Sequence, residues 1–160
     1  MQFFQSKALY AALFFFSLFS IGIQAQENTE LSPQMAELKK LPSFLREGSF
    51  IYLQQGVNQA VNLWKNHYAP SRYKEEFSRV FRERMRELTN DSGDLIKVEL
   101  IRERKITNSL RAYYLLFGYE DGVVFVRFDL YVGGEGLQIV GYKLDSDMTE
   151  VLPGYMEVAD

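Results

Sequence analysis

Arg84 is the charged side chain whose position most strongly suggests chemistry. It lies between Phe81 and Leu88 in the apolar stripe of a predicted helix, where a purely structural helix would carry an apolar residue. A guanidinium at this place could bind a carboxylate through two parallel hydrogen bonds. Alternatively, its stem packs on the core while its charged end reaches water. We predict a small organic ligand, with an anionic group where it meets Arg84.

Three aromatic residues are the predicted walls of the same ligand site, namely Tyr113, Trp64 and Tyr52. Large aromatic side chains at such spacings are also common in a plain hydrophobic core, so both interpretations stay open. Arg111 raises the same question as Arg84, but it lies near a predicted strand end, where its head can reach solvent.

No residue can be assigned a catalytic role. The only histidine, His67, lies near a predicted helix end and just before Pro70, a place typical of a solvated imidazole or a helix-end contact. Asp129 is the one carboxylate at a strand centre. Because Arg127 lies beside it, Asp129 is expected to form an ion pair rather than to act as a general base. The sequence therefore favours a protein that is not an enzyme.

Metal, cofactor and nucleic-acid sites are not predicted either. The chain has no cysteine, one histidine and a net charge of −3. The stretches 90–94 and 145–147 lack the spaced oxygen ligands and distal glutamate of a calcium loop. Arginines within residues 79–86 are interleaved with glutamates, and a helix face of mixed charge does not attract the phosphates of a nucleic acid. We expect no cofactor, no metal and no nucleic-acid partner.

The N-terminus has the layout of a secretory signal peptide over residues 1–25. Lys7 supplies a basic start, residues 8–23 are predominantly apolar, and Ala25 is a small residue at the expected cleavage point. An uncleaved anchor usually needs about 20 apolar residues, which is longer than this run. We predict cleavage after Ala25 and a periplasmic or secreted product without membrane contact. Because there is no cysteine, lipid attachment at the cut and disulfides are excluded.

The remainder of the chain suits one domain. Residues 26–43 are predicted to be a leader and a short helix, residues 44–152 the α+β domain, and residues 153–160 a tail. Within this span the helices are expected over residues 33–41, over residues 50–68 with Ser49 as N-cap, and over residues 71–88.

After residue 94 the pattern changes from helix to strand. Strands are expected over residues 95–104, 110–119, 123–132 and 137–144, and Ile96, Val98 and Leu100 should share one face of the first. Asp121-Gly122 is a two-residue hairpin signal, and Gly134-Glu135 is a second tight turn. The predicted fold class is α+β, with N-terminal helices packed on a four-stranded antiparallel sheet.

The hairpin at Asp121-Gly122 assigns the two faces of this sheet. It places Tyr119 opposite Val124 and turns Tyr113 toward the helices. The other face is largely apolar, although a solvated face is normally polar. We therefore predict a homodimer through this outer face, and the alternative is cover by the N-terminal segment or by residues 151–160. The predicted interface residues are Tyr114, Leu116, Phe125, Arg127, Asp129, Tyr131 and Tyr142.

Two segments carry a resemblance to a known family: "GSFIYLQQGVNQAVNLWKNHY" and "LRAYYLLFGYEDGVVFVRFDLYVGGEGLQIVGYKLD". Their order and hydrophobic pattern resemble the NTF2-like superfamily, in its small exported branch of uncharacterised proteins. The resemblance implies a cone in which a curved sheet wraps a helix, leaves a pocket at the open end and dimerises through its outer face. No strand or hairpin separates the second and third helices, so a cystatin-like or other α+β meander stays open.

These observations lead to three functional hypotheses. The first is an exported, non-catalytic domain that binds a small organic ligand. The second is a structural or accessory envelope protein whose outer sheet face contacts another protein. An NTF2-like isomerase or hydrolase ranks last, because no inward-facing carboxylate or histidine can be named.

Overall fold

The computed structural model describes residues 38–152, and within them helices precede a four-stranded antiparallel sheet. The predicted α+β class and element order are therefore confirmed. The predicted signal peptide, most of residues 33–41 and the tail 153–160 lie outside the described residues. The elements are α2 (Ser43–Gln55), α3 (Val57–Asn66), the 3₁₀ turn η1 (Ser71–Tyr73), α4 (Lys74–Thr89), β1 (Leu95–Lys105), β2 (Leu110–Tyr119), β3 (Gly122–Gly133), β4 (Gly136–Asp145) and α5 (Met148–Val151).

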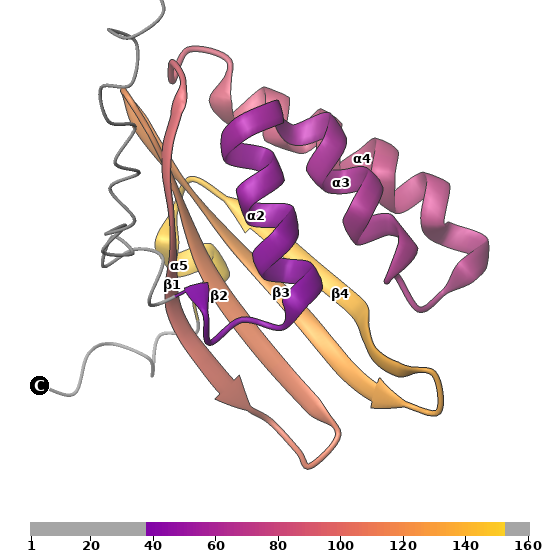
Figure 1. The fold of residues 1–160 in the computed structure, drawn as a ribbon. Helices are drawn as coiled ribbons and strands as arrows, with labels where there is room; N and C mark the ends of the chain where they lie inside the picture. The colour runs from indigo at the N-terminus through magenta and orange to yellow at the C-terminus, as the bar shows by residue number, and fades with distance from the viewer. Residues whose placement is uncertain (1–37, 153–160) are drawn as a thin grey trace, which may run out of the picture. The chain divides into compact units, whose positions relative to one another are not determined.

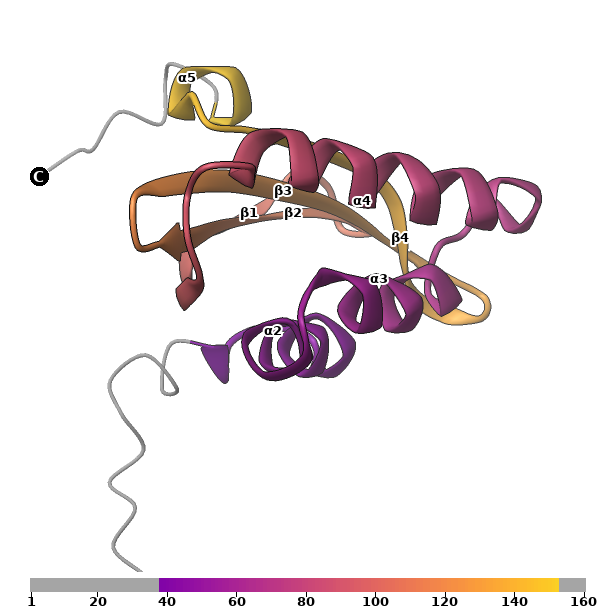
Figure 2. The same cartoon turned by 90° about the horizontal axis from the view of Figure 1, so that it is seen from above.

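The described elements form layers on both sides of a curved sheet. The strands lie in the order β1-β2-β3-β4, and α2 and α3 lie on one side while α5 lies on the other (Figures 1 and 2). Helix α2 contacts β1, and α4 contacts α3, β3 and β4. None of the helices in this part of the chain is long and apolar enough to cross a membrane.

The predicted helix over residues 50–68 is two helices, because Gly56 breaks it. Gly56 has φ 82°, a left-handed conformation that glycine adopts at little cost. Ser49 is not an N-cap: it is buried within α2 and donates a hydrogen bond to the Leu45 carbonyl at 2.9 Å. The helix begins earlier, at Ser43, because Phe44 and Leu45 already pack into the core.

Trp64 occupies the centre of the core between the helices and the sheet. Its side chain is fully buried, and its ring centroid lies 5.4 Å from that of Phe81 and 5.1 Å from that of Phe128. Gly48 of α2 lies against the indole, and a Cβ added there would overlap Trp64 Nε1. Close approach of α2 to α3 therefore depends on glycine at this position. Leu38 belongs to the same buried cluster.

The β2–β3 hairpin differs from its predicted register by two residues. Tyr119 pairs with Gly122, so the loop is Glu120-Asp121 rather than Asp121-Gly122. The amides of Glu120 and Asp121 donate to the carbonyls of Asp94 and Ser92 at 3.1 and 3.0 Å, which fixes the loop against the α4–β1 connection. Since the shift is even, it leaves each side chain on its predicted face.

A bulge in β4 reverses part of the predicted face assignment. The loop Gly134-Glu135 is as predicted, but Leu130 pairs with Ile139 while Asp129 pairs with Gly141, leaving Val140 as an extra residue. Beyond the bulge, Tyr142 faces the helices, and its ring lies 5.0 Å from that of Phe77. The prediction that Tyr142 lies on the outer face is therefore wrong.

Register shifts also change the first strand. Pairing of β1 with β2 slips between Leu95 and Lys97 and again between Leu100 and Arg102. Val98 and Leu100 face the core as predicted, but Ile96 does not, since it is 58% exposed. The strand instead presents charged side chains to the outer face, namely Lys97, Glu99, Arg102 and Arg104.

The outer face is covered at its centre by the C-terminal end of the described chain. Ala112 and Tyr114 are buried in a small cluster with Val151, and Phe125 and Leu152 pack against it. Helix α5 is started by Asp147, whose carboxylate accepts a hydrogen bond from the Thr149 amide at 2.8 Å. Residues 151 and 152 thus supply part of the cover that the alternative prediction assigned to residues 151–160.

Candidate functional site

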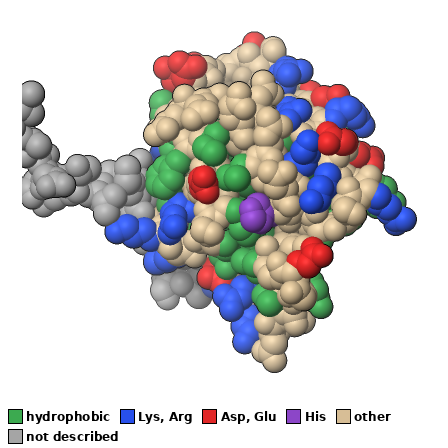
Figure 3. Space-filling view, turned by 45° about the vertical axis from the view of Figure 1, so that its right-hand side comes forward, with side chains coloured by type: hydrophobic (Ala, Val, Ile, Leu, Met, Phe, Trp, Pro, Cys, Tyr) green, Lys and Arg blue, Asp and Glu red, His purple; other side chains and the backbone are tan. Residues whose placement is uncertain are grey.

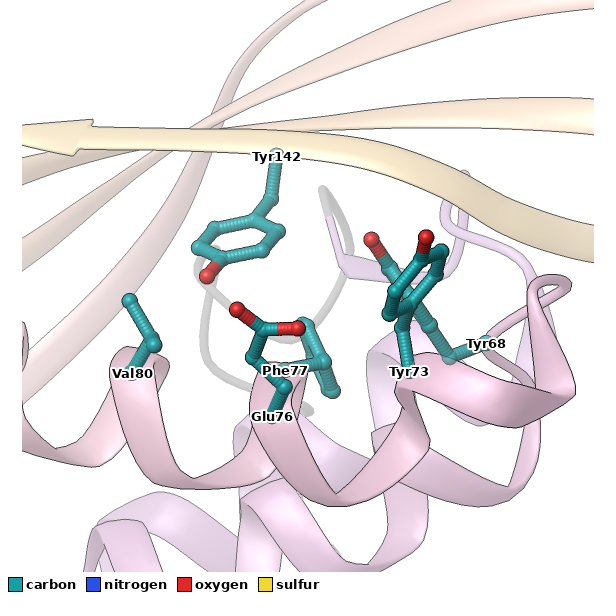
Figure 4. A pocket seen from close by; sticks show the side chains of 6 residues that line it. All are labelled: Tyr68, Tyr73, Glu76, Phe77, Val80 and Tyr142. Carbon is teal, nitrogen blue, oxygen red and sulfur yellow. The ribbon is translucent and has the colours of Figure 1, made fainter.

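A pocket of about 330 Å³ lies between the start of α4 and the middle of β4. Its walls come from separate parts of the chain that meet only in the folded protein (Figure 4). Four of its six lining residues are aromatic, and one is a carboxylate. The lining residues are Tyr68, Tyr73, Glu76, Phe77, Val80 and Tyr142.

Backbone contacts at the edge of β4 position two sides of the pocket. The segment after α3 runs parallel to β4: the Ile139 amide donates to the His67 carbonyl, and the Ala69 amide donates to the Ile139 carbonyl, both at 2.8 Å. This pairing holds Tyr68 beside the strand. One residue further along β4 from Ile139, the bulge at Val140 turns Tyr142 toward α4.

The aromatic rings of the pocket are packed against one another. Tyr68 and Phe77 stack with their centroids 4.5 Å apart and their planes 13° from parallel. Phe77 meets the ring of Tyr142 edge-on, at 5.0 Å and 82°. Because Phe77 is also buried, it forms a fixed floor on which the two tyrosines rest.

Four polar groups converge on the pocket without partners among the described residues. The structure gives no hydrogen bond or ion pair within the described residues for the hydroxyls of Tyr68, Tyr73 and Tyr142 or for the carboxylate of Glu76. Figure 4 shows the Glu76 carboxylate between Tyr142 on one side and Tyr73 on the other. These groups are therefore available to a ligand.

Two half-buried phenols of the pocket, those of Tyr68 and Tyr142, have raised pKa values. Burial raises the pKa of Tyr142, and the neighbouring Tyr68 and Glu76 add to the effect. Burial also raises the pKa of Tyr68, again with a contribution from Glu76. Both phenols are therefore protonated near neutral pH and can donate and accept hydrogen bonds, but they do not act as bases.

A second pocket, of about 470 Å³, lies between the end of α2 and the start of β1. Its tyrosine hydroxyls are bonded to each other, since Tyr52 Oη and Tyr119 Oη are 2.7 Å apart. Burial raises the pKa of Tyr52 strongly, and Tyr119 adds to the rise. The lining residues are Tyr52, Leu53, Gln54, Gly56, Thr89, Gly93, Asp94, Leu95 and Tyr119.

The structure does not bring the four predicted ligand-binding residues together. Arg84 lies at the surface, where it pairs with Glu87 at 3.2 Å and with Asp145 at 3.3 Å. It therefore ties α4 to the end of β4 and lines neither of the two pockets described above. Its charge is already matched by two carboxylates, so the geometry offers no reason to place an anionic ligand there.

The aromatic members of that set are also dispersed. Trp64 is enclosed in the core, and Tyr113 donates a hydrogen bond to Glu103 at 3.1 Å, beside the 2.7 Å ion pair of Glu103 with Arg111. Tyr52 alone lines one of these pockets, the second. A binding role for any of the four stays a prediction.

The predicted interface residues occupy different environments. Tyr114 is buried beneath α5, and Arg127 lies 5.8 Å from its ring centroid. Arg127 and Asp129 form an ion pair at 2.7 Å, which confirms that pairing. Tyr131 is 45% exposed, and Tyr142 lies on the helix side. The remaining two, Leu116 and Phe125, are half-buried on the outer face.

His67 ends α3, as its position in the sequence predicts. Its imidazole stacks on Phe44 with centroids 4.2 Å apart, and burial lowers its pKa, helped by Lys74 and opposed by Glu47. Figure 3 shows the histidine at the surface with apolar side chains around it, and basic and acidic side chains interleaved on the same view. Within the described chain no three His, Asp or Glu side chains are grouped as metal ligands.

Sequence reasoning missed the pocket between the start of α4 and β4. Tyr68, Tyr73 and Glu76 were not singled out, and Tyr142 was placed on the wrong face. One signal was present: Gly141 lies inside a predicted strand, and glycine there often marks a bulge. Nothing in the helical pattern indicates that Tyr73 and Glu76 would meet β4.

Comparisons with known proteins give little further information on the site. No family model matches the sequence, and no curated protein is significantly similar to it. Among solved structures, a domain of unknown function with a cystatin-like fold from Nostoc punctiforme PCC 73102 is similar, with 12% identity and a TM-score of 0.45 over 71% of this chain and 79% of that chain.

Proposed function

We propose that this domain binds a small organic molecule, without transforming it, in the pocket between η1, α4 and β4. The observation that carries the proposal is the convergence of Tyr68, Tyr73, Glu76 and Tyr142, whose polar groups have no partner among the described residues, on one aromatic-lined pocket. Ligand sites typically combine apolar walls with a few polar groups that fix orientation, in volumes of about 300–1,000 Å³. The pocket has both features.

Binding rather than catalysis is supported by the acid–base character of the walls. A general base needs a pKa near the working pH. Burial moves the pKa of Tyr68 and Tyr142 upward, away from neutrality. These phenols can therefore orient a ligand but cannot readily remove its proton.

The second pocket is a weaker candidate because its polar groups are already used. Tyr52 and Tyr119 satisfy each other at 2.7 Å. A ligand that bonded to either hydroxyl would first have to break that contact, so it would gain less than a ligand that meets unpartnered groups.

Export and family membership are part of the same proposal. Export is supported by the signal layout of residues 1–25. An NTF2-like relationship is supported by the order of helices and four-stranded meander and by the curvature of the sheet. Mass spectrometry of the mature protein tests export, because cleavage after Ala25 leaves Gln26 as the first residue.

The binding proposal is tested by a panel of small neutral, cationic and anionic aromatic and aliphatic compounds, followed through amide chemical shifts. We expect bound compounds to shift amides near Tyr68, Glu76 and Tyr142. Val80→Phe fills the pocket and should weaken binding by at least about tenfold. Val123→Phe is the matched control, since Val123 is exposed on β3 and lines neither described pocket.

Two results would contradict the proposal. Compounds could shift only amides remote from the pocket, or Val80→Phe could bind them as well as the original protein. Tyr73→Ala provides a second variant if Val80→Phe folds poorly, because Tyr73 is 42% exposed and contributes little to the core.

Protein contact through the outer sheet face is the second candidate, either as a homodimer or with an envelope protein. Its support is that Tyr131 and Val123, at opposite ends of β3, are 45% and 39% exposed. Light scattering at increasing concentration tests self-association, and Tyr131→Glu should abolish any dimer that uses this face. A mass that stays monomeric throughout rejects the homodimer.

A further inference from the structure

We infer that the ligand of the Tyr68–Tyr142 pocket is a small organic cation, such as a quaternary or alkylated ammonium group. This inference rests on the proposed function and names the chemical class that the pocket recognises. It follows from the nature of the walls and from the unmatched charge of Glu76.

The walls present aromatic faces and no basic side chain. Of the six lining residues, Tyr68, Tyr73, Phe77 and Tyr142 are aromatic, and none is lysine or arginine. The face of an aromatic ring carries partial negative charge and attracts a cation within about 6 Å of its centroid. An alkylated ammonium also has apolar methyl groups, which such rings cover well.

One ring of the pocket already binds a cation within the protein. The guanidinium carbon of Arg72 lies 4.6 Å from the centroid of Tyr73. Tyr73 is 42% exposed, so part of its surface remains open beside the pocket. Because Arg72 covers one face of Tyr73 and repels a second cation, a ligand cation would be held mainly by the rings of Tyr68 and Tyr142 and by the carboxylate of Glu76.

Glu76 gives the pocket a negative charge that nearby side chains leave unmatched. Its neighbours on α4 are paired: Glu75 with Lys65 at 2.8 Å, and Glu83 with Arg79 at 2.6 Å. Within the described residues Glu76 has no such partner. Its charge acts on the pocket, since it helps to raise the pKa of both Tyr68 and Tyr142.

Arg79 is a second cation, besides Arg72, that could oppose this arrangement. It lowers the pKa of Tyr142, against the larger effect of burial, so its charge reaches the pocket. Its guanidinium is engaged by Glu83, however, and it does not line the space. The carboxylate of Glu76 is inside the lining, so the nearer charge is negative. An anionic ligand would meet that carboxylate directly and be repelled.

The experiment compares three compounds of nearly the same shape, followed by amide chemical shifts on the full-length chain. The first is choline. The second is its neutral isostere, in which a quaternary carbon replaces the nitrogen. The third is the anion tert-butylacetate. We expect choline to shift amides around Tyr68, Glu76 and Tyr142 and to bind about tenfold more tightly than the neutral isostere, while the anion does not bind.

Two variants on the same helix separate the Glu76 charge from net charge. Glu76→Gln should weaken choline binding by about fivefold or more, with little change for the neutral isostere. Glu87→Gln removes the same charge from the same helix outside the pocket and should leave choline binding within about twofold. Both side chains are exposed, so neither variant should perturb folding.

The outcomes distinguish this inference from the proposed function. If the neutral isostere or the anion binds the pocket as tightly as choline, the cation inference is wrong and the binding function stands. If Glu76→Gln and Glu87→Gln have equal effects, recognition by Glu76 is likewise rejected. If choline fails to shift the pocket amides, the inference is overturned, and the broader panel with Val80→Phe decides the proposed function separately.

Discussion

The two faces of the sheet are both apolar at their centres, but they are covered in different ways. On one face α2, α3 and α4 bury Trp64, Phe117 and Phe128 in a large aromatic core. On the other face one four-residue helix and the residue after it cover Ala112, Tyr114 and part of Phe125. An apolar second face therefore does not by itself require a partner protein.

The difference follows from how far each apolar area extends. The outer face is bordered by charged residues of β1, including Lys97 and Arg102, and by Lys143 on β4 beyond the bulge. Its apolar centre is therefore narrow enough for the side chains of Val151 and Leu152. On the helix-facing side every strand contributes apolar residues to one core, which needs a full layer of helices.

The largest loss of stability is expected from the substitution Gly48→Ala, on the helix side of the sheet. Alanine usually stabilises a helix relative to glycine by about 1 kcal/mol. Here its Cβ would overlap the buried indole of Trp64, and overpacking of this kind costs about 1–3 kcal/mol or more. We expect net destabilisation of about 2 kcal/mol in urea denaturation. Gly134→Ala, with open space around it, should be neutral within about 0.5 kcal/mol.

A stabilising effect of Gly48→Ala would show that α2 can move away from α3. In that case the helix layer would be less tightly fixed than its geometry indicates, and the contrast between the two faces would weaken.

A smaller effect is expected on the outer face, from Val151→Ala. Val151 is buried against Tyr114 and Ala112, and removing two methyl groups should cost about 1.5 kcal/mol. Met148→Ala is the control, because Met148 belongs to the same helix and is 47% exposed. Chemical denaturation at two protein concentrations checks the result. Stability that rises with concentration would indicate that a second copy, rather than α5, dominates cover of this face.

The smallest effect is a pH dependence of stability that arises from His67, at the end of α3. Burial lowers the pKa of His67 from its ordinary 6.5, with Lys74 lowering it further and Glu47 opposing. The unfolded chain then binds the proton more readily, so the His67 contribution is fully present above about pH 6.5 and is lost as pH falls through the lowered value. His67→Phe should keep the stack on Phe44 and lose less thermal stability between about pH 7.5 and pH 5.5.

An equal loss in the His67→Phe variant would show that the imidazole is not the titrating group. The carboxylates that face the helix layer would then have to account for the pH dependence.

The β2–β3 pair and the β4 strand show why prediction succeeded in one place and failed in the other. Tyr113 and Phe117 were placed on the helix side correctly although the loop was misassigned, because an error of two residues preserves the alternation. Tyr142 was assigned to the wrong face because one extra residue, Val140, reverses the alternation of side chains in the rest of β4. The ion pair of Arg84 with Asp145 could not be predicted, because Asp145 lies on a strand whose proximity no helical pattern reveals.

The sequence by itself determined the order of helices and strands and the apolar inward face of β2 and β3. Local periodicity and turn chemistry carry that information, and each repeats over many residues. Only the tertiary structure decided the pocket and the cover of the outer face. Both depend on individual local features, namely the bulge at Val140, the pairing of Ile139 with the segment after α3 and the packing of Val151 on the sheet. The contacts that stabilise these features join residues far apart in the chain, so no local pattern predicts them.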